Sequence, residues 1–368
     1  MSGKGAPPLT GIKVVELARI LAGPWAGQVL ADLGAEVVKV ESPAGDDTRR
    51  WGPPFVGEDA AYFHATNRGK TSVVADFATE QGRAAVLELV RNADVLIENF
   101  KLGGLGKFGL DYDSLSAINP RLVYCSITGF GHDGPYAARA GYDFIVQGMS
   151  GIMDLTGDPA GPPQKIGVAY ADILTGLYAV IAIQAALRQR EATGRGQLID
   201  MALMDVMVGT LANQAMNCLV SGESPTRMGN AHPNIAPYEA FPVADGWIII
   251  AVGNDGQFLR LAEVLDLPVP EQWRSNAARV ANRIGLSHAI ATRTGEWERE
   301  ALLAALEERG VPAGPINTVA EALADPQIAA RGMVLDLGDG LKGLRTPIRF
   351  SDAELALGKP SPKLGESA

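Results

Sequence analysis

The stretch Lys165-Ile166-Gly167-Val168-Ala169-Tyr170-Ala171-Asp172-Ile173-Leu174-Thr175-Gly176-Leu177-Tyr178-Ala179 leads into the longest uncharged apolar segment of this 368-residue chain. After Asp172 nearly every residue is apolar as far as Leu187, and Gly194 follows a basic turn. This pattern predicts a helix of about five turns that is apolar nearly all round, and therefore buried, and that ends at Gly194.

Asp172 is the last charged residue before this helix, at its N-cap or close to it. The positive end of a helix favours the ionised form of a carboxylate. Asp172 is therefore either a helix cap, since Asp is a preferred N-cap residue, or a nucleophile. A nucleophilic carboxylate needs no general base, because an ordinary Asp pKa of about 3.9 leaves it ionised at neutral pH. Position alone leaves both interpretations open.

Composition limits the classes of function. The chain has 32 Lys and Arg against 42 Asp and Glu, a net charge of −10, which argues against a dedicated nucleic-acid binder. Cys125 and Cys218 form no CxxC motif, and the four histidines lack metal-ligand spacing, so we expect reduced thiols and no metal site. Residues 1–8 show no signal peptide, and the apolar residues 173–187 are fewer than a membrane span requires. We expect a soluble cytoplasmic protein without a membrane partner.

The first residues predict a parallel sheet. Residues 11–17 read as a strand, 25–33 as a helix and 36–41 as a second strand, which together form a βαβ unit. Glu41 at the end of the second strand suggests a dinucleotide site, but the loop 20–27 has no G-x-G-x-x-G motif. A nicotinamide enzyme is therefore only a minor alternative.

A glycine-rich segment, residues 99–109, follows a predicted strand at 93–98. Its backbone N–H groups could hold a phosphate with help from Lys101 or Lys107, or the segment could be a flexible loop.

The amino-acid composition changes in the second half of the chain. Residues 200–221 read as another long apolar helix, and 222–237 are rich in Gly, Pro, Asn and Ser, which indicates a boundary. An α+β pattern follows. Within it Asn254 and Asp255 read most simply as turn and cap residues.

Ordered landmarks along nearly the whole chain resemble the class III CoA-transferases, the group that contains formyl-CoA:oxalate and carnitine CoA-transferases. They are residues 9–17, 67–70, 94–100, 119–122, 193–197 and 310–315. The resemblance places the family's catalytic aspartate at Asp172. It implies covalent catalysis, in which this carboxylate attacks an acyl-CoA and becomes an aspartyl-CoA thioester. Acyl-CoA and coenzyme A are then substrates, and no tightly bound cofactor is expected.

The resemblance also implies the surroundings of Asp172. The active-site lining would be Leu21, Trp51, Tyr62, Tyr142, Asp143, Asn254 and Asp255. CoA would be bound by Ile20, Leu21, Ala22, Ala75, Asp76, Phe77, Ala78, Asn99, Phe100, Lys101, Lys107 and Ala140.

The architecture implied by the resemblance is an α/β, Rossmann-like large domain with a small α+β domain, in an intertwined homodimer. On this chain the large domain would take residues 1–200 and be completed by about 330–368. A linker helix would occupy 201–225 and the small domain 226–318, with 319–368 returning to the large domain.

Two rivals to transfer remain. An α-methylacyl-CoA racemase carries a histidine where this chain has Tyr142, and a phenol with a pKa near 10 is a poor base at neutral pH. Tyr142 therefore favours the transferase over the racemase. The more remote rival is a CoA-binding protein without turnover.

The residues 227–258 are most similar to family members that use succinyl-CoA and small dicarboxylates such as glutarate, mesaconate or citramalate. A distal carboxylate needs a cation, for which Arg49, Arg50, Arg68 and Arg227 are candidates. Oxalate is a poor candidate, because Leu21 replaces a polar residue of the oxalate enzyme.

Overall fold

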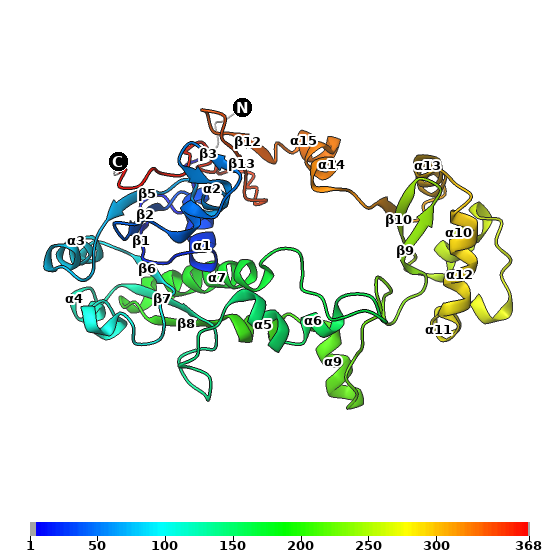
Figure 1. Cartoon of the computed structure of the whole chain (residues 1–368), viewed down its shortest axis with the longest axis horizontal. Helices are drawn as coiled ribbons and strands as arrows, with labels where there is room; N and C mark the ends of the chain where they lie inside the picture. Colours follow the sequence, from blue (N-terminus) through cyan, green and yellow to red (C-terminus); the bar gives the residue numbers. More distant parts are fainter. Residues whose placement is uncertain (1–4, 367–368) are drawn as a thin grey trace. The chain divides into compact units, whose positions relative to one another are not determined.

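The computed structural model describes residues 5–366, which form two compact units. Unit 1 contains the residues up to Ile152, then Lys165–Glu223, and those from Pro326 onwards. Unit 2 contains Met153–Gln164 and Ser224–Asp325. The chain therefore leaves unit 1 and returns to it twice, as the colours in Figure 1 allow the reader to follow.

Unit 1 is built on a six-stranded parallel sheet in the order β5-β2-β1-β6-β7-β8. The strands are β1 (Lys13–Glu16), β2 (Glu36–Glu41), β5 (Thr71–Val74), β6 (Val95–Glu98), β7 (Val123–Thr128) and β8 (Leu198–Ala202). The prediction of a parallel α/β sheet is confirmed. The direction of winding reverses between β1 and β6, and in such sheets a crevice for ligands opens beyond the carboxyl ends of the strands at that point.

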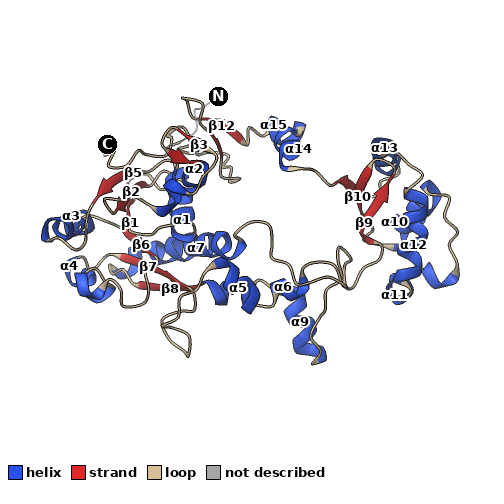
Figure 2. Cartoon of the chain, in the orientation of Figure 1, coloured by secondary structure: helices blue, strands red, loops and turns tan. Residues whose placement is uncertain are grey.

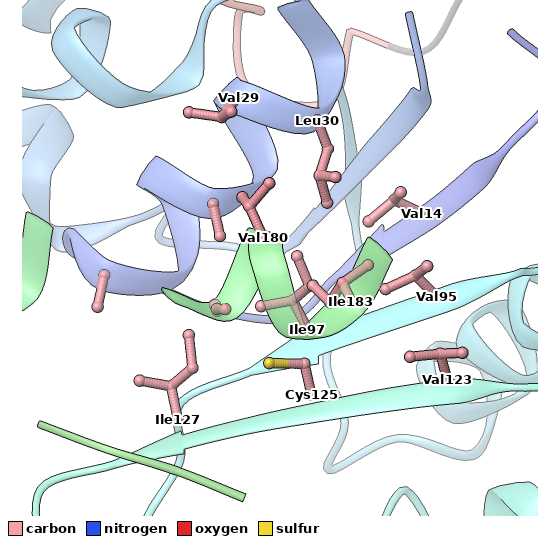
Figure 3. Packing of buried hydrophobic residues seen from close by; sticks show 14 of the residues in the cluster. Val14, Val29, Leu30, Val95, Ile97, Val123, Cys125, Ile127, Val180 and Ile183 are labelled. Carbon is pink, nitrogen blue, oxygen red and sulfur yellow. The ribbon is translucent and has the colours of Figure 1, made fainter. Parts of the chain in front are cut away.

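Helices cover both faces of the sheet, because apolar side chains alternate along its strands. Val14 faces the core under α1 (Ala22–Asp32) and α7 (Tyr170–Thr193), as Figure 3 shows. Val15 faces the core under α3 (Glu80–Arg91) and α4 (Tyr112–Ile118). Each fully buried Val, Leu or Ile contributes about 1.5–3 kcal/mol, so these two layers hold the sheet rigid beneath its loops.

Helix α7 ends as predicted. It stops at Thr193, and Gly194 follows in the left-handed conformation at φ 72°. The prediction that it is buried all round is wrong, since Leu177, Tyr178 and Ile181 are exposed in this chain. The reason is that α1, the sheet, α5 (Asp143–Met149) and α8 (Leu203–Gly209) pack against the rest of the helix and leave these side chains uncovered within this chain.

By length and composition alone, α7 would also be enough to cross a membrane. The apolar residues 173–187 alone are too few for a membrane span, but the helix is longer than this segment and continues to Thr193. Residues from Ala171 to Leu187 nevertheless supply part of the hydrophobic core, the position of a core helix in a globular unit.

The prediction of one continuous helix over 200–221, assigned to a linker helix at 201–225, is wrong. Asp200 and its neighbours pair with β7 as the edge strand β8, and the chain then forms α8 (Leu203–Gly209) and α9 (Ala212–Ser221). Ala212 lies at φ 47°, outside the right-handed helical region, so no continuous helix can pass through it. A short apolar run does not distinguish a buried strand from a helix.

Short elements complete unit 1. They are η1 (Asp47–Arg50), β3 (Phe55–Val56), β4 (Asp59–Ala60), α2 (Ala61–Asn67), η2 (Gly106–Phe108), α5 (Asp143–Met149), α6 (Ile152–Leu155, which ends in unit 2), α15 (Pro326–Ala330), β12 (Val334–Asp336) and β13 (Lys342–Leu344).

Unit 2 has its own antiparallel sheet and core (Figure 2). Its strands, in the order β11-β10-β9, are β9 (Tyr238–Val243), β10 (Gly246–Ala251) and β11 (Ala313–Pro315). Its helices are α10 (Asp255–Val264), η3 (Glu271–Trp273), α11 (Asn276–Ala281), α12 (Arg283–Thr294), α13 (Arg299–Glu308) and α14 (Val319–Ala324).

Candidate active site

A pocket of about 630 Å³ lies beyond the carboxyl ends of β1, β6 and β7, and Asp172 is one of its lining residues. The loops that follow these three strands form most of its wall. This volume is within the range of small-molecule and cofactor sites, and the position matches the crevice expected where the winding of the sheet reverses.

Twelve residues predicted from the sequence line this one pocket. They are Asp172 with Ile20, Leu21, Ala22, Trp51, Asn99, Phe100, Lys101, Lys107, Ala140, Tyr142 and Asp143. The tertiary fold therefore brings the glycine-rich segment after β6 and the loop after β1 to the same cavity as Asp172. The individual roles of these residues stay predictions.

Other predicted residues lie behind the pocket wall. Tyr62 packs edge-on against Trp51, with ring centroids 5.3 Å apart. Burial and the negative charges of Asp172 and Asp143 raise the pKa of Tyr62, so its phenol remains protonated and able to donate a hydrogen bond.

The predicted segment Ala75, Asp76, Phe77 and Ala78 does not line the cavity but supports it. The Phe77 ring lies 6.1 Å from that of Phe100 and 6.0 Å from that of Phe108, centroid to centroid, and both of these partners line the pocket.

Asn254 and Asp255 belong to unit 2. The Asn254 side chain accepts a hydrogen bond from the Gln257 N–H and so caps α10, while Asp255 pairs with the buried Arg279 at 2.7 Å. The turn-and-cap interpretation is thus confirmed for Asn254, and the lining role of both residues stays a prediction.

Asp172 is the third residue of α7, not its cap. The capping group is Asp143, whose Oδ1 accepts a hydrogen bond from the Ala171 N–H at 2.9 Å. The fully buried Gln147 fixes Asp143 in turn, by donating from its Nε2 to Asp143 Oδ2 at 2.8 Å. Asp143 is therefore a carboxylate that already accepts hydrogen bonds from the protein. The side chain of Asp172 beside it makes no hydrogen bond among the described residues.

Burial, followed by the negative charge of Asp143, raises the pKa of Asp172 to about 7. The expectation of an ordinary, fully ionised Asp172 at neutral pH is therefore wrong. A helix N-terminus favours a carboxylate by only about 0.3–1 kcal/mol, whereas a rise in pKa of this size corresponds to about 4 kcal/mol. Desolvation outweighs the helix dipole, and the ionised form that remains is poorly solvated and reactive.

The loop after β1 and the first residue of α1 line the same cavity, through Arg19, Ile20, Leu21 and Ala22. Helix α1 begins at Ala22 with Leu21 as its N-cap, and no side chain caps it. The first N–H groups of an uncapped helix are free to bind an anion, and their positive end suits a developing negative charge.

Four cations line the pocket: Arg19, Lys101, Lys107 and Arg139. We did not predict Arg19 or Arg139, although each immediately precedes a residue that the resemblance assigned to CoA. Arg139 stacks on the Tyr136 ring at 4.5 Å, and among residues 5–366 it joins no ion pair. The other lining residues that we did not predict are Asp47, Leu102, Gly104, Phe108, Ile127, Thr128, Gly129, Ala137, Gly141 and Leu203.

Within the described part of the chain, no group of three or more His, Cys, Asp or Glu residues is arranged to hold a metal ion.

A carboxylate with a raised pKa, the start of a helix and four cations in one cavity describe an α/β enzyme that binds an anionic substrate. The chain belongs to CoA-transferase family III, which matches residues 9–368. It is accordingly a CoA-transferase, and the preference for transfer over racemisation is confirmed at the level of the family.

Similar proteins cover almost the full chain. Succinate–glutarate CoA-transferase of Agrobacterium fabrum is 59% identical, over 98% of this chain and 94% of that protein. Human succinyl-CoA:glutarate CoA-transferase is 41% identical, over 98% of this chain and 84% of that protein. The crystal structure of a CAIB/BAIF family protein from Brucella suis matches with a TM-score of 0.91 and 66% identity, over 98% of this chain and 97% of that one.

Proposed function

We propose that this enzyme moves CoA from succinyl-CoA to a small dicarboxylic acid, glutarate or a close relative, through a covalent intermediate on Asp172. The observation that carries the proposal is the 59% identity to a succinate–glutarate CoA-transferase, together with a pocket that contains the expected aspartate.

The chemistry requires two acyl exchanges at Asp172. Its carboxylate attacks the thioester carbonyl, the C–S bond breaks, and CoA thiolate leaves a mixed anhydride behind. The thiolate then attacks the Asp172 carbonyl carbon, which gives the aspartyl-CoA thioester and releases the donor carboxylate. The acceptor carboxylate repeats both steps in reverse, so no net proton is consumed. Covalent catalysis of this kind divides one difficult transfer into easier steps.

The pocket supplies the remaining needs of this scheme. Each tetrahedral intermediate carries an oxyanion, which the free N–H groups at the start of α1 can stabilise. The phosphates of CoA require cations, and Arg19, Lys101, Lys107 and Arg139 provide them.

Among the four arginines considered for the distal carboxylate, Arg50 is the best supported. Arg49 and Arg68 are buried in ion pairs with Glu41 and Asp32, and Arg227 pairs with Asp154 in unit 2. Arg50 pairs with Asp47 and donates to the Ala44 carbonyl on an exposed edge, directly before Trp51 of the pocket. Such an exposed ion pair is weak enough for a substrate to displace.

We further propose an intertwined homodimer, as the resemblance implies. Exposed apolar side chains on α7 and α9 support it: Ile181 is 62% exposed, Leu219 77% and Val220 80%. Large apolar side chains exposed to this degree are characteristic of an interface. Asn254 and Asp255 are proposed to line the site of the assembled enzyme.

The domain assignment is proposed in the same way. The sheet strands, numbered one to six along the chain, lie in the order 3-2-1-4-5-6, which supports a Rossmann-like large domain. We keep the large domain at 1–200 and about 330–368, and the small domain at 226–318. We also propose a cytoplasmic enzyme that uses no tightly bound cofactor, nucleic acid or membrane, in keeping with the net charge of −10.

The test is to incubate the protein with succinyl-CoA and a panel of mono- and dicarboxylic acids, and to identify new thioesters by mass spectrometry. Glutarate should be among the best acceptors, and hydroxylamine should modify Asp172 only when acyl-CoA is present. Normal turnover by Asp172→Asn would overturn the mechanism, and a monocarboxylate preference would overturn the acceptor class.

A further inference from the structure

Ile20 has a strained backbone. Its φ of 72° lies in the left-handed region, which a β-branched residue rarely adopts because of clashes at its Cβ. Ile20 and the next residue, Leu21, both line the pocket, and Leu21 is the N-cap from which α1 starts. Strain of this kind persists only where the surrounding structure imposes it, and it gathers at functional sites.

Hydrogen bonds to Ile20 and to the residue before it hold this conformation. The Ile20 N–H donates to Asp46 Oδ2 at 3.2 Å. The preceding residue, Arg19, is held by Asn99, which accepts from the Arg19 N–H at 2.9 Å and donates to the Arg19 carbonyl at 2.7 Å. Asn99 lines the pocket, whereas Asp46 does not.

Asp46 is itself held by a buried ion pair. The side chain is almost fully buried, with Lys39 Nζ at 2.9 Å from Oδ2. Thr48 donates to Oδ1 from its N–H at 3.0 Å and from its Oγ1 at 2.8 Å. The charge of Lys39 and the bonds from Thr48 lower the pKa of Asp46 to about 2 despite its burial, so it is an anion at every working pH.

Lys39 connects this carboxylate to the end of β1. Its Nζ also donates to the Ala18 carbonyl at 2.9 Å and to Glu16 Oε1 at 3.1 Å. The Lys39 ammonium group thus contacts two groups that hold this loop. One is Asp46, which accepts from the Ile20 N–H, and the other is the carbonyl of Ala18, two residues before Ile20. A buried charge network that is satisfied in this way rigidifies what it contacts.

We propose that Asp46 and Lys39 are positioning residues for CoA transfer, which hold the strained Ile20–Leu21 turn so that the N–H groups at the start of α1 face the reacting carbonyl. This inference rests on the proposed function of the pocket. Neither side chain needs to touch the substrate. Both act through the backbone of the loop.

The primary test is Asp46→Asn, which keeps the shape of the side chain and removes its charge. We expect kcat for succinyl-CoA:glutarate transfer to fall about 30-fold, because loss of one oxyanion donor costs about 10²–10³-fold and the loop would be displaced only in part. The KM for succinyl-CoA should change less than about 3-fold. Asp32→Asn is the matched control. Asp32 is as buried as Asp46, and its ion pair with Arg68 does not contact the loop.

A second background separates positioning from general stability. Glycine adopts positive φ without strain, so in Ile20→Gly the turn needs no tether. Asp46→Asn should then cost less than about 3-fold in kcat when it is added to Ile20→Gly. An equal loss in both backgrounds, or an equal loss from Asp32→Asn, would overturn the proposal.

If Asp46→Asn does not fold, Thr48→Val removes one bond to the same carboxylate and should reduce kcat about 3- to 10-fold, again only in the Ile20 background. Unchanged kcat in this variant would also overturn the inference. Failure of the proposed function looks different, since the unmodified enzyme would then transfer no CoA between succinyl-CoA and a dicarboxylate.

Discussion

Replacing Asp172 with asparagine should abolish transfer and yet stabilise the protein, increasingly so as the pH rises. The pKa of Asp172 is raised from 3.8 to about 7, because the folded protein buries the carboxylate and places Asp143 beside it. Because this pKa is raised, the folded state binds the Asp172 proton more tightly than the unfolded state does. Ionisation therefore destabilises the fold progressively as the pH rises from about 4 to above 7.

The magnitude follows from the change in pKa. The rise from 3.8 to about 7 corresponds to about 4 kcal/mol of destabilisation once the pH exceeds 7, and to about 2 kcal/mol at about pH 5, where only the unfolded chain is ionised. These values are upper limits, since Asp172 is partly exposed to water in the pocket. The amide of the Asp172→Asn variant carries no charge, so its gain in free energy of unfolding should be larger at pH 8 than at pH 5, by at most about 2–3 kcal/mol.

Urea denaturation of both proteins at pH 5 and pH 8, at one protomer concentration, measures this difference. Asp133→Asn is the control, because it removes the same charge from an exposed loop. A gain that is equal at the two pH values, or a less stable Asp172→Asn at pH 8, would refute the reasoning that burial makes this carboxylate costly.

Four further outcomes are expected. Asp143→Asn keeps the Oδ1 acceptor but removes the charge that helps to raise the pKa of Asp172, so the acidic limb of kcat/KM should move to lower pH; an unmoved limb would exclude this coupling. Lys107→Met should weaken CoA binding about 5- to 10-fold by calorimetry, with a smaller loss at high salt if the contact is ionic. Arg50→Met should raise the KM for glutarate several-fold and leave that for a monocarboxylic acid unchanged, whereas equal effects would rule out a distal clamp. Ile181→Lys places a charge on the exposed apolar face of α7 and should shift light-scattering mass towards the monomer, whereas an unchanged mass would remove this face from the interface.

Several local features could be predicted from the sequence because short-range chemistry determines them. The apolar residues within 11–17 predict a strand of a parallel sheet, and the structure has β1 there. The end of α7 follows from a basic turn and a glycine, since glycine adopts the left-handed cap at Gly194 without strain. Asp172 was selected by its place before an apolar helix and by resemblance, and the fold puts it in the pocket.

Other features could not be predicted, because they depend on residues that are distant in the chain. The apolar segment after Ile199 was read as one helix, but pairing with β7 makes its start a strand. The exposed side of α7 is indistinguishable by composition from its buried side. The strain at Ile20 depends on Asp46, which the fold brings to its N–H from beyond the next strand.

Residue patterns alone predict the parallel α/β sheet, the end of its principal helix and an aspartate near the start of that helix. These follow from periodicity, capping and residue type, which act over a few neighbouring residues. How that aspartate ionises depends on folding, since burial and the approach of Asp143 from another helix change its solvation and its local field. A pKa is a property of the surroundings in space, and so the chemistry of the site emerged only after folding.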